Sequence, residues 1–181
     1  MNRPLLFLDV DGPLNPYAAQ PERRPAGYTT IRVPRARTEG EDHGGRRLPL
    51  RVWLNPEHGR SLLRLGYELC WATTWMDDAN RWIGPVLGLP VLPFVDFGDA
   101  LHRESPDGVH WKTRVLVDHA DGRPFAWVDD EQSGPDHAYV TDHHRGAGLL
   151  HHVNPRIGLR EDDFPTLADF ARAPTTWQTP G

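Results

Sequence analysis

Runs of consecutive apolar residues recur along the chain and predict strands that are buried on both faces. The clearest of these runs covers residues 5–10, further strands are expected over 67–73, 124–128 and 149–153, and a shorter extended segment is expected at 91–95. A strand with one face in water alternates apolar and polar residues, whereas a strand of a parallel sheet is covered by helices on both sides and reads as a continuous apolar run. The runs therefore indicate the strands of a parallel sheet.

Helix signals lie between the predicted strands. Asn55-Pro56-Glu57 combines an N-cap residue, a proline at the first helical position and an acid in the first turn, and this helix is expected to end at Gly66. Further helices, indicated by apolar residues at helical spacing, are expected over 76–87, 111–119, 135–142 and 160–171. Because strands and helices alternate, the predicted fold class is α/β, a Rossmann-like three-layer fold around a mostly parallel sheet.

Residues 13–54 interrupt this alternation and are rich in proline, glycine and arginine. Two segments within them, 28–33 and 48–54, are expected to pair as a small β-hairpin. The loop between them, 34–47, is rich in glycine.

Length and composition predict one soluble globular domain over residues 1–173, followed by a flexible tail, 174–181. The single cysteine, Cys70, excludes an intrachain disulfide. The apolar residues before Asp9 are too few for a signal peptide, and no segment reaches the roughly 20 apolar residues of a membrane span. No membrane association and a cytoplasmic location are therefore expected.

Charge is unevenly distributed along the chain, whose formal net charge is -5. Residues 21–52 contain eight arginines and four acidic residues, so this insert carries +4 and the remainder of the chain carries -9. A basic insert suits a polyanionic partner such as nucleic acid. A solvated loop explains the same composition, and charge alone favours that interpretation.

Polar residues that can carry chemistry follow three of the predicted strands. They are Asp9 and Asp11, Thr73 and Thr74, and the acidic run Asp129-Asp130-Glu131. Because the carboxyl ends of parallel strands meet at one edge of the sheet, these side chains should line one crevice. Acidic groups gathered there need a cation, and carboxylate oxygens without paired histidines or cysteines favour a hard ion, with Mg²⁺ the common choice.

Lysine occurs once among the 20 basic residues, at position 112, in the helix that precedes the strand 124–128. Arginine serves as the cation everywhere else. Lys112 is therefore expected where a compact ammonium is needed and a planar guanidinium does not fit.

The order of these groups resembles the motif order of the haloacid dehalogenase-like (HAD) superfamily of phosphatases. The segment 8–15, with its Asp-Val-Asp-Gly core, is similar to the first motif of that family, and 71–75 is similar to the second. Lys112 fits the third motif, and 127–131 resembles the fourth. The likeness extends from residue 5 to about residue 170. The Trp-Ala-Thr-Thr-Trp sequence of 71–75 is also similar to HAD domains associated with RNA repair proteins.

The resemblance implies a Mg²⁺-dependent phosphohydrolase, a phosphomonoesterase that acts through an aspartyl-phosphate intermediate. Asp9 would be the nucleophile, and Asp11 would be the general acid and base. The residues implied to bind the phosphoryl group are Thr73, Thr74, Lys112 and Gly12. The residues implied to bind the metal are Asp9, Asp11 through its backbone carbonyl, and Asp129, with Asp130 a close alternative to Asp129.

Within this family, a small insert leaves the site open. Residues 13–54 have room for a hairpin flap and not for a full cap domain, which suits large substrates such as phosphorylated nucleic acid ends beside the arginine-rich insert. A phosphatase of small metabolites or nucleotides, and a non-catalytic phosphate-binding module, remain open as alternatives. A receiver domain is disfavoured because its acidic pair and its phosphorylated Asp occur in a different order. A dehalogenase needs neither Asp11 nor the second acidic pair.

Overall fold

Four parallel strands form the central sheet in the order β4-β1-β5-β6. The computed structural model of the chain describes residues 3–34 and 48–174. The strands are β1 (Leu5–Leu8), β4 (Glu68–Trp71), β5 (Phe125–Asp129) and β6 (Gly148–His152). Each lies within one of the four predicted strands or overlaps most of it, so the α/β fold class and the parallel sheet are confirmed.

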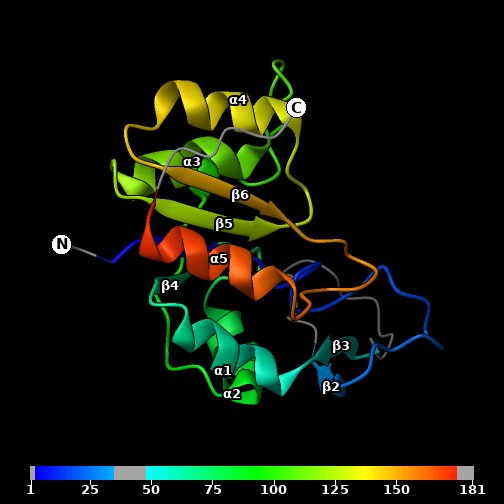
Figure 1. Ribbon diagram of the computed structural model, residues 1–181. Helices are drawn as coiled ribbons and strands as arrows, with labels where there is room; N and C mark the ends of the chain where they lie inside the picture. The colour runs from blue at the N-terminus through cyan, green and yellow to red at the C-terminus, as the bar shows by residue number, and fades with distance from the viewer. Residues whose placement is uncertain (1–2, 35–47, 175–181) are drawn as a thin grey trace.

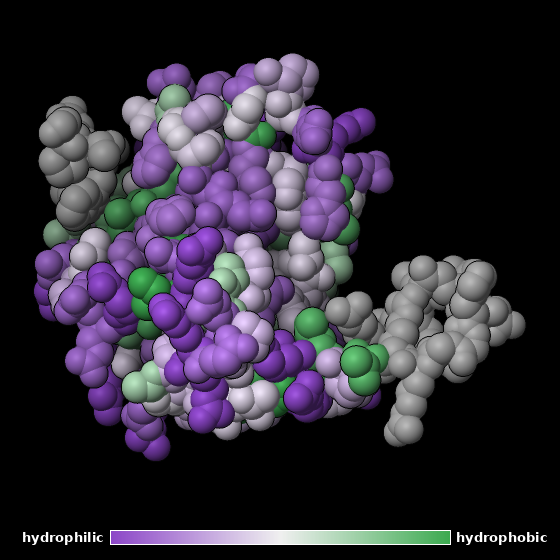
Figure 2. Space-filling model, turned by 90° about the vertical axis from the view of Figure 1, so that its right-hand side faces the viewer, coloured by the Kyte–Doolittle hydropathy of each residue, from purple (hydrophilic) through white to green (hydrophobic). Residues whose placement is uncertain are grey.

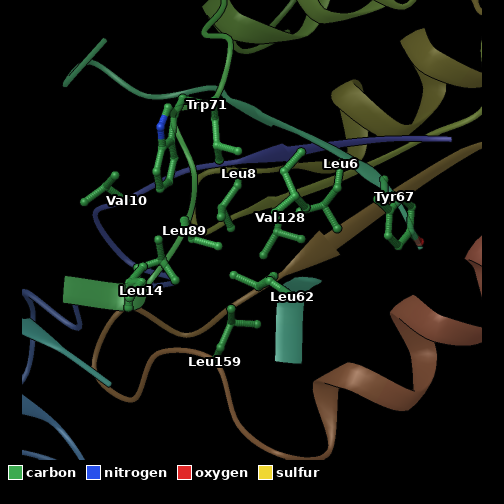
Figure 3. Close-up of a cluster of buried hydrophobic side chains, with 14 of the residues drawn as sticks. Leu6, Leu8, Val10, Leu14, Leu62, Tyr67, Trp71, Leu89, Val128 and Leu159 are labelled. Carbon is green, nitrogen blue, oxygen red and sulfur yellow. The ribbon is translucent and has the colours of Figure 1, made fainter. Parts of the chain in front are cut away.

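Helices cover both faces of the sheet (Figure 1). One layer contains α1 (Pro56–Arg64), α2 (Gly84–Leu87) and α5 (Asp163–Arg172). The other contains α3 (Trp111–Ala120) and α4 (Gly134–His143). Because neighbouring side chains of a strand point to opposite faces, Leu6 and Leu8 of β1 pack in the first layer and Leu5 and Phe7 pack in the second. Figure 3 shows the first of these two cores.

The segment 76–87 differs from the single helix that its apolar spacing predicts. It contains a π-helix, Ala79–Ile83, followed by the short helix α2. Pro85 has no N–H to continue a regular α-helical ladder, which accounts for the break. The extended segment expected at 91–95 is present, because Trp71 and Phe94 form an isolated parallel bridge. A short 3₁₀ helix, Gly98–Ala100, lies in the polar loop that follows.

The expected hairpin is present as the antiparallel strands β2 (Thr29–Val33) and β3 (Leu50–Leu54). Its buried residues Val33, Val52 and Leu54 belong to the same hydrophobic core as α1, α2 and α5. The hairpin is therefore packed onto the sheet domain. Most of the arginine-rich loop (35–47), and the tail from 175 to 181, lie outside the described residues.

None of the helices in the part of the chain that the structure describes has both the length and the hydrophobicity needed to cross a bilayer.

Gly59 allows α1 to lie directly against the backbone of α2. A Cβ atom at this position would lie 1.8 Å from the carbonyl oxygen of Leu87. We predict that Gly59→Ala lowers the free energy of unfolding by about 1–3 kcal/mol, because the two helices must separate. Helix propensity alone predicts the opposite sign, a gain of about 1 kcal/mol. Urea denaturation of the two proteins measures the difference.

Gly134→Ala is the matched control for this prediction. Gly134 lies in the first turn of α4, and a Cβ atom there would meet nothing within 4 Å. This variant is expected to be as stable as the original chain or slightly more stable. A Gly59→Ala protein with unchanged stability would contradict the close approach of α1 and α2.

Candidate active site

The ammonium group of Lys112 lies between two carboxylates at the carboxyl ends of neighbouring strands. Asp9 directly follows β1, and Asp129 is the last residue of β5. Lys112 Nζ lies 2.8 Å from Asp9 Oδ2 and 2.7 Å from Asp129 Oδ2. β1 and β5 pair side by side in parallel, so the sheet itself brings the two acids together. The convergence of strand ends expected from the sequence is therefore present in the structure.

Lys112 reaches this position from the first turn of α3. Its side chain is only 1% exposed, in keeping with a site where a compact ammonium is required. His110 caps the helix by accepting a hydrogen bond from the Lys112 backbone N–H. The start of α3 is therefore held next to the ends of β1 and β5.

Asp136 fixes the start of α3 from the opposite side. It is fully buried, and its Oδ1 accepts hydrogen bonds from the His110 N–H at 2.8 Å and the Thr113 hydroxyl at 2.6 Å. Its Oδ2 accepts from the backbone N–H and the hydroxyl of Ser133, which begin α4. One carboxylate thus joins the N-terminal ends of both helices on this face of the sheet.

Burial and the neighbouring opposite charge have opposite effects on the pKa values of Asp9 and Lys112. Burial raises the pKa of Asp9 and the neighbouring charge of Asp129 raises it further, whereas Lys112 and a hydrogen bond from Thr73 lower it. Burial alone would lower the pKa of Lys112, but Asp9 and Asp129 outweigh burial and raise that pKa. The lysine is therefore held in its charged form by the two acids.

Asp130 adds a third carboxylate to the group. One oxygen from each of Asp9, Asp129 and Asp130 lies within 4.8 Å of the others. Burial, followed by the charge of Asp129, raises the pKa of Asp130 to about 6. Its Oδ2 accepts a hydrogen bond of 3.1 Å from the Tyr17 hydroxyl. When all three carboxylates are ionised, the one ammonium leaves two negative charges uncompensated. Burial, together with the charge of Asp129, accordingly raises the pKa of Asp9 to about 7 even beside Lys112.

The donor set fits a hard divalent cation. Its ligand atoms would be carboxylate oxygens, which Mg²⁺ prefers, and two positive charges would balance the group. Asp129 is fully buried, and its oxygens already accept hydrogen bonds from Lys112, Trp127 and Glu131. Asp130 instead lines the open pocket described below. Both acids that the sequence offers as alternatives are therefore at the group, and Asp130 is the more accessible of the two.

Gly12, which the resemblance implies in phosphoryl binding, lies against Asp130. Its N–H donates to the Asn15 carbonyl at 2.9 Å, so this N–H is already used within the loop. Its φ angle is +92°, and a Cβ atom there would lie 2.3 Å from Asp130 Oδ1. Glycine is therefore required at this position because it makes room for Asp130.

The side chain of Asp11 lies apart from the group of three carboxylates but lines the same pocket. Its Oδ1 accepts a hydrogen bond of 2.7 Å from Asn15 Nδ2, and its Oδ2 accepts one of 2.8 Å from Trp75 Nε1. Both of its oxygens are thus oriented by neighbouring side chains.

The two threonines after β4 differ in exposure. Thr73 is buried, and its Oγ1 accepts the Trp75 backbone N–H at 3.4 Å as well as contributing to the environment of Asp9. Thr74 is exposed and lines the pocket. Thr74 is therefore the more accessible of the two hydroxyls.

These groups surround a pocket of about 530 Å³. Its wall also includes residues from the loop after β1, the hairpin, the segment that leads into α3 and the loop after β5, namely Asn15, Tyr17, Leu50, Arg51, His102, Trp111 and Glu131. The face toward which the strands in Figure 1 point is mostly hydrophilic in Figure 2, with only small apolar patches. The carboxyl ends of the parallel strands, where the pocket lies, are at this face.

Several of these residues carry no sequence signal for a site. Tyr17 lies in the irregular insert, where no periodicity places it near Asp130. Asn15 ends the segment 8–15 that resembles the first family motif, but nothing in that motif predicts its bond to Asp11. Trp75 carries a sequence signal, because it follows the Thr73-Thr74 pair and ends the segment 71–75 that resembles the second family motif. His110 and Asp136 become recognisable only once α3 and α4 are packed side by side.

We predict that Lys112→Met lowers the free energy of unfolding by about 3–5 kcal/mol at neutral pH, because two carboxylates stay buried without their cation. The main group that lowers the pKa of Asp9 is then lost. The variant should therefore lose stability as the pH rises above the ordinary aspartate value of about 4 and regain it on acidification. Urea denaturation over a pH series measures both effects.

Arg60→Met serves as the control. It removes an ion pair of 3.1 Å between Arg60 and Glu57 on the surface of α1. Exposed pairs contribute at most about 1 kcal/mol. If Lys112→Met costs no more than Arg60→Met, the buried ion group does not stabilise the fold.

Comparisons of the chain with protein-family models, with curated proteins and with solved structures returned no match. The function proposed below therefore rests on the residues and their geometry.

Proposed function

We propose that the protein is a Mg²⁺-dependent phosphomonoesterase of the HAD type, with Asp9 as its nucleophile. The observation that carries the proposal is the group at the ends of β1 and β5. Asp9 and Asp129 share the ammonium of Lys112, and Asp130 completes a group of three carboxylates with the spacing to hold a cation, at the edge of an open pocket. Acidic groups whose pKa is raised by burial and by a specific charged neighbour cluster at functional sites, and phosphoryl transfer uses metal ions to neutralise developing charge.

The first step forms an aspartyl-phosphate. A carboxylate oxygen of Asp9 attacks phosphorus, the ester P–O bond breaks, and Asp11 gives a proton to the departing oxygen so that an alcohol leaves. In the second step Asp11 takes a proton from water, the water oxygen bonds to phosphorus, and the P–O bond to Asp9 breaks. Inorganic phosphate leaves, and both carboxyl groups return to their starting states.

Asp9, Asp130 and Asp129 would hold the metal, which when bound supplies positive charge opposite the phosphoryl oxygens. Lys112 keeps Asp9 and Asp129 close together and supplies part of the balancing charge. Thr74, at the pocket wall, offers a hydroxyl to a phosphoryl oxygen.

The pocket also supports a substrate with a second anionic group, such as a phosphorylated nucleic acid end. Arg51 on β3 and Lys112 are the arginine and lysine that line the described pocket, and Lys112 is already engaged by two carboxylates. The guanidinium carbon of Arg51 lies 3.9 Å from the centroid of the Trp53 ring, which stacks the flat group in place. Arg51 is thus positioned to meet an anion outside the reacting phosphate.

Two other functions account for parts of the same geometry. A phosphatase of small metabolites or nucleotides uses the same reacting group and differs only in what Arg51 meets. A non-catalytic phosphate-binding module would retain the metal site without turnover. Activity measurements separate the three.

We predict that the protein hydrolyses an aryl phosphate in the presence of Mg²⁺ and loses this activity when the metal is chelated. Asp9→Asn should lower kcat by a factor of about 10³ or more, because the nucleophile is removed. Asp118→Asn, a change of an exposed acid on α3, should leave the rate close to that of the original chain. Activity that survives Asp9→Asn would exclude this mechanism. Mg²⁺ binding without hydrolysis of any phosphate ester would favour the binding module.

Arg51→Met tests whether Arg51 binds a second anionic group of the substrate. We expect it to raise KM roughly tenfold for an oligonucleotide with a terminal phosphate and to reduce the salt dependence of that KM, since one phosphate contact is lost. KM for phenyl phosphate, which has no second anion, should change little. Arg81→Met is the matched control, because Arg81 also lies over a tryptophan ring, that of Trp82, but does not line the pocket. An equal change of KM for both substrates would argue against a second anion site.

A further inference from the structure

The carboxylate of Asp11 is oriented by two donors from different parts of the chain. Asn15 Nδ2 donates to Oδ1 at 2.7 Å from the loop after β1. Trp75 Nε1 donates to Oδ2 at 2.8 Å from the turn after β4. Each carboxylate oxygen can accept a second hydrogen bond or carry a proton, so both contacts are compatible with the transfer of a proton by Asp11.

The hairpin determines which way the Asn15 amide faces. Asn15 is buried, and its Oδ1 accepts a hydrogen bond of 3.0 Å from the backbone N–H of Trp53 in β3. A backbone N–H can only donate, so the amide oxygen must face Trp53 and the amide NH₂ must face Asp11. The orientation of Asp11 is therefore linked through Asn15 to the strand that carries Arg51.

Trp75 is held in place by its own turn and by the hydrophobic core. Its backbone N–H bonds to Thr73 Oγ1 at 3.4 Å, and its carbonyl accepts the Asp78 N–H at 2.9 Å. Its ring packs, partly buried, against the hydrophobic core under the sheet. The indole N–H therefore reaches Asp11 from a rigid turn.

We propose that Trp75 and Asn15 are positioning residues, which hold the carboxyl group of Asp11 where it can protonate the leaving oxygen of the substrate. The inference rests on the proposed phosphatase function and adds two residues to it. Asp11 follows the strand at a loop and is partly exposed, so without these donors its side chain would sample several rotamers. General acid catalysis needs the donor within hydrogen-bond reach of the leaving oxygen, so a small displacement is costly.

The leaving group provides a test that a purely structural role would not pass. p-Nitrophenolate is a weak base and departs without a proton, whereas the alkoxide of glycerol phosphate requires one. For both substrates kcat/KM reports formation of the aspartyl-phosphate at Asp9. Trp75→Phe removes the indole N–H and keeps an aromatic ring. We expect it to lower kcat/KM for glycerol phosphate roughly tenfold or more and to change kcat/KM for p-nitrophenyl phosphate little.

Trp82→Phe is the matched control, since Trp82 is a partly buried tryptophan that packs on the same core and does not line the pocket. It should not discriminate between the two substrates. A double-mutant cycle with Asp11→Ala completes the experiment: once Asp11 is absent, Trp75→Phe should cause no further loss with glycerol phosphate.

Equal losses for the two substrates in Trp75→Phe, no loss for either, or a loss that persists in the Asp11→Ala background would each overturn the positioning role. Those results would not contradict the proposed phosphatase function, provided that the Asp9→Asn protein is inactive. Absence of any Asp9-dependent hydrolysis would overturn both proposals.

Discussion

A buried ammonium shared by two carboxylates is the interaction on which the rest of the structure depends. Parallel pairing of β1 and β5 brings Asp9 and Asp129 to adjacent strand ends, where two buried negative charges would repel each other. Lys112 removes that conflict and, in doing so, docks the first turn of α3 onto the edge of the sheet. Asp130 adds a further carboxylate to this group, so its charge is again negative when the acids are ionised. The same edge of the sheet is therefore suitable for a divalent cation.

The sheet and the acids at its edge could be predicted because both depend on local patterns. Continuous apolar runs distinguish strands buried on both faces, and topology places the residues that follow such strands at one edge. Asp9, Asp129 and Lys112 were accessible to this reasoning, and the rarity of lysine marked the third of them. The choice between Asp129 and Asp130 was not accessible, because it depends on which carboxylate is already hydrogen-bonded.

The remaining parts of the site depend on tertiary packing that no local pattern encodes. Tyr17 meets Asp130 only when the loop after β1 lies beside the end of β5, a contact between residues 113 positions apart. In the sequence, Gly12 indicates only a flexible backbone in the loop after the strand. In the structure, the absence of a side chain at Gly12 makes space for Asp130. The segment 76–87 has helical spacing throughout, but Pro85 interrupts the ladder and a π-helix results.

The buried carboxylate of Asp136 has a consequence for how substitutions in this protein would be interpreted. It holds the start of α3, and therefore the base of the Lys112 side chain, through His110 and Thr113. A survey of tolerated amino acids would thus find position 136 as constrained as the acids at the pocket, although it takes no part in the chemistry. Positions that do not tolerate mutation would include the residues that support Lys112 as well as the residues that react with the substrate. Only the geometry of the site would distinguish these two sets of residues.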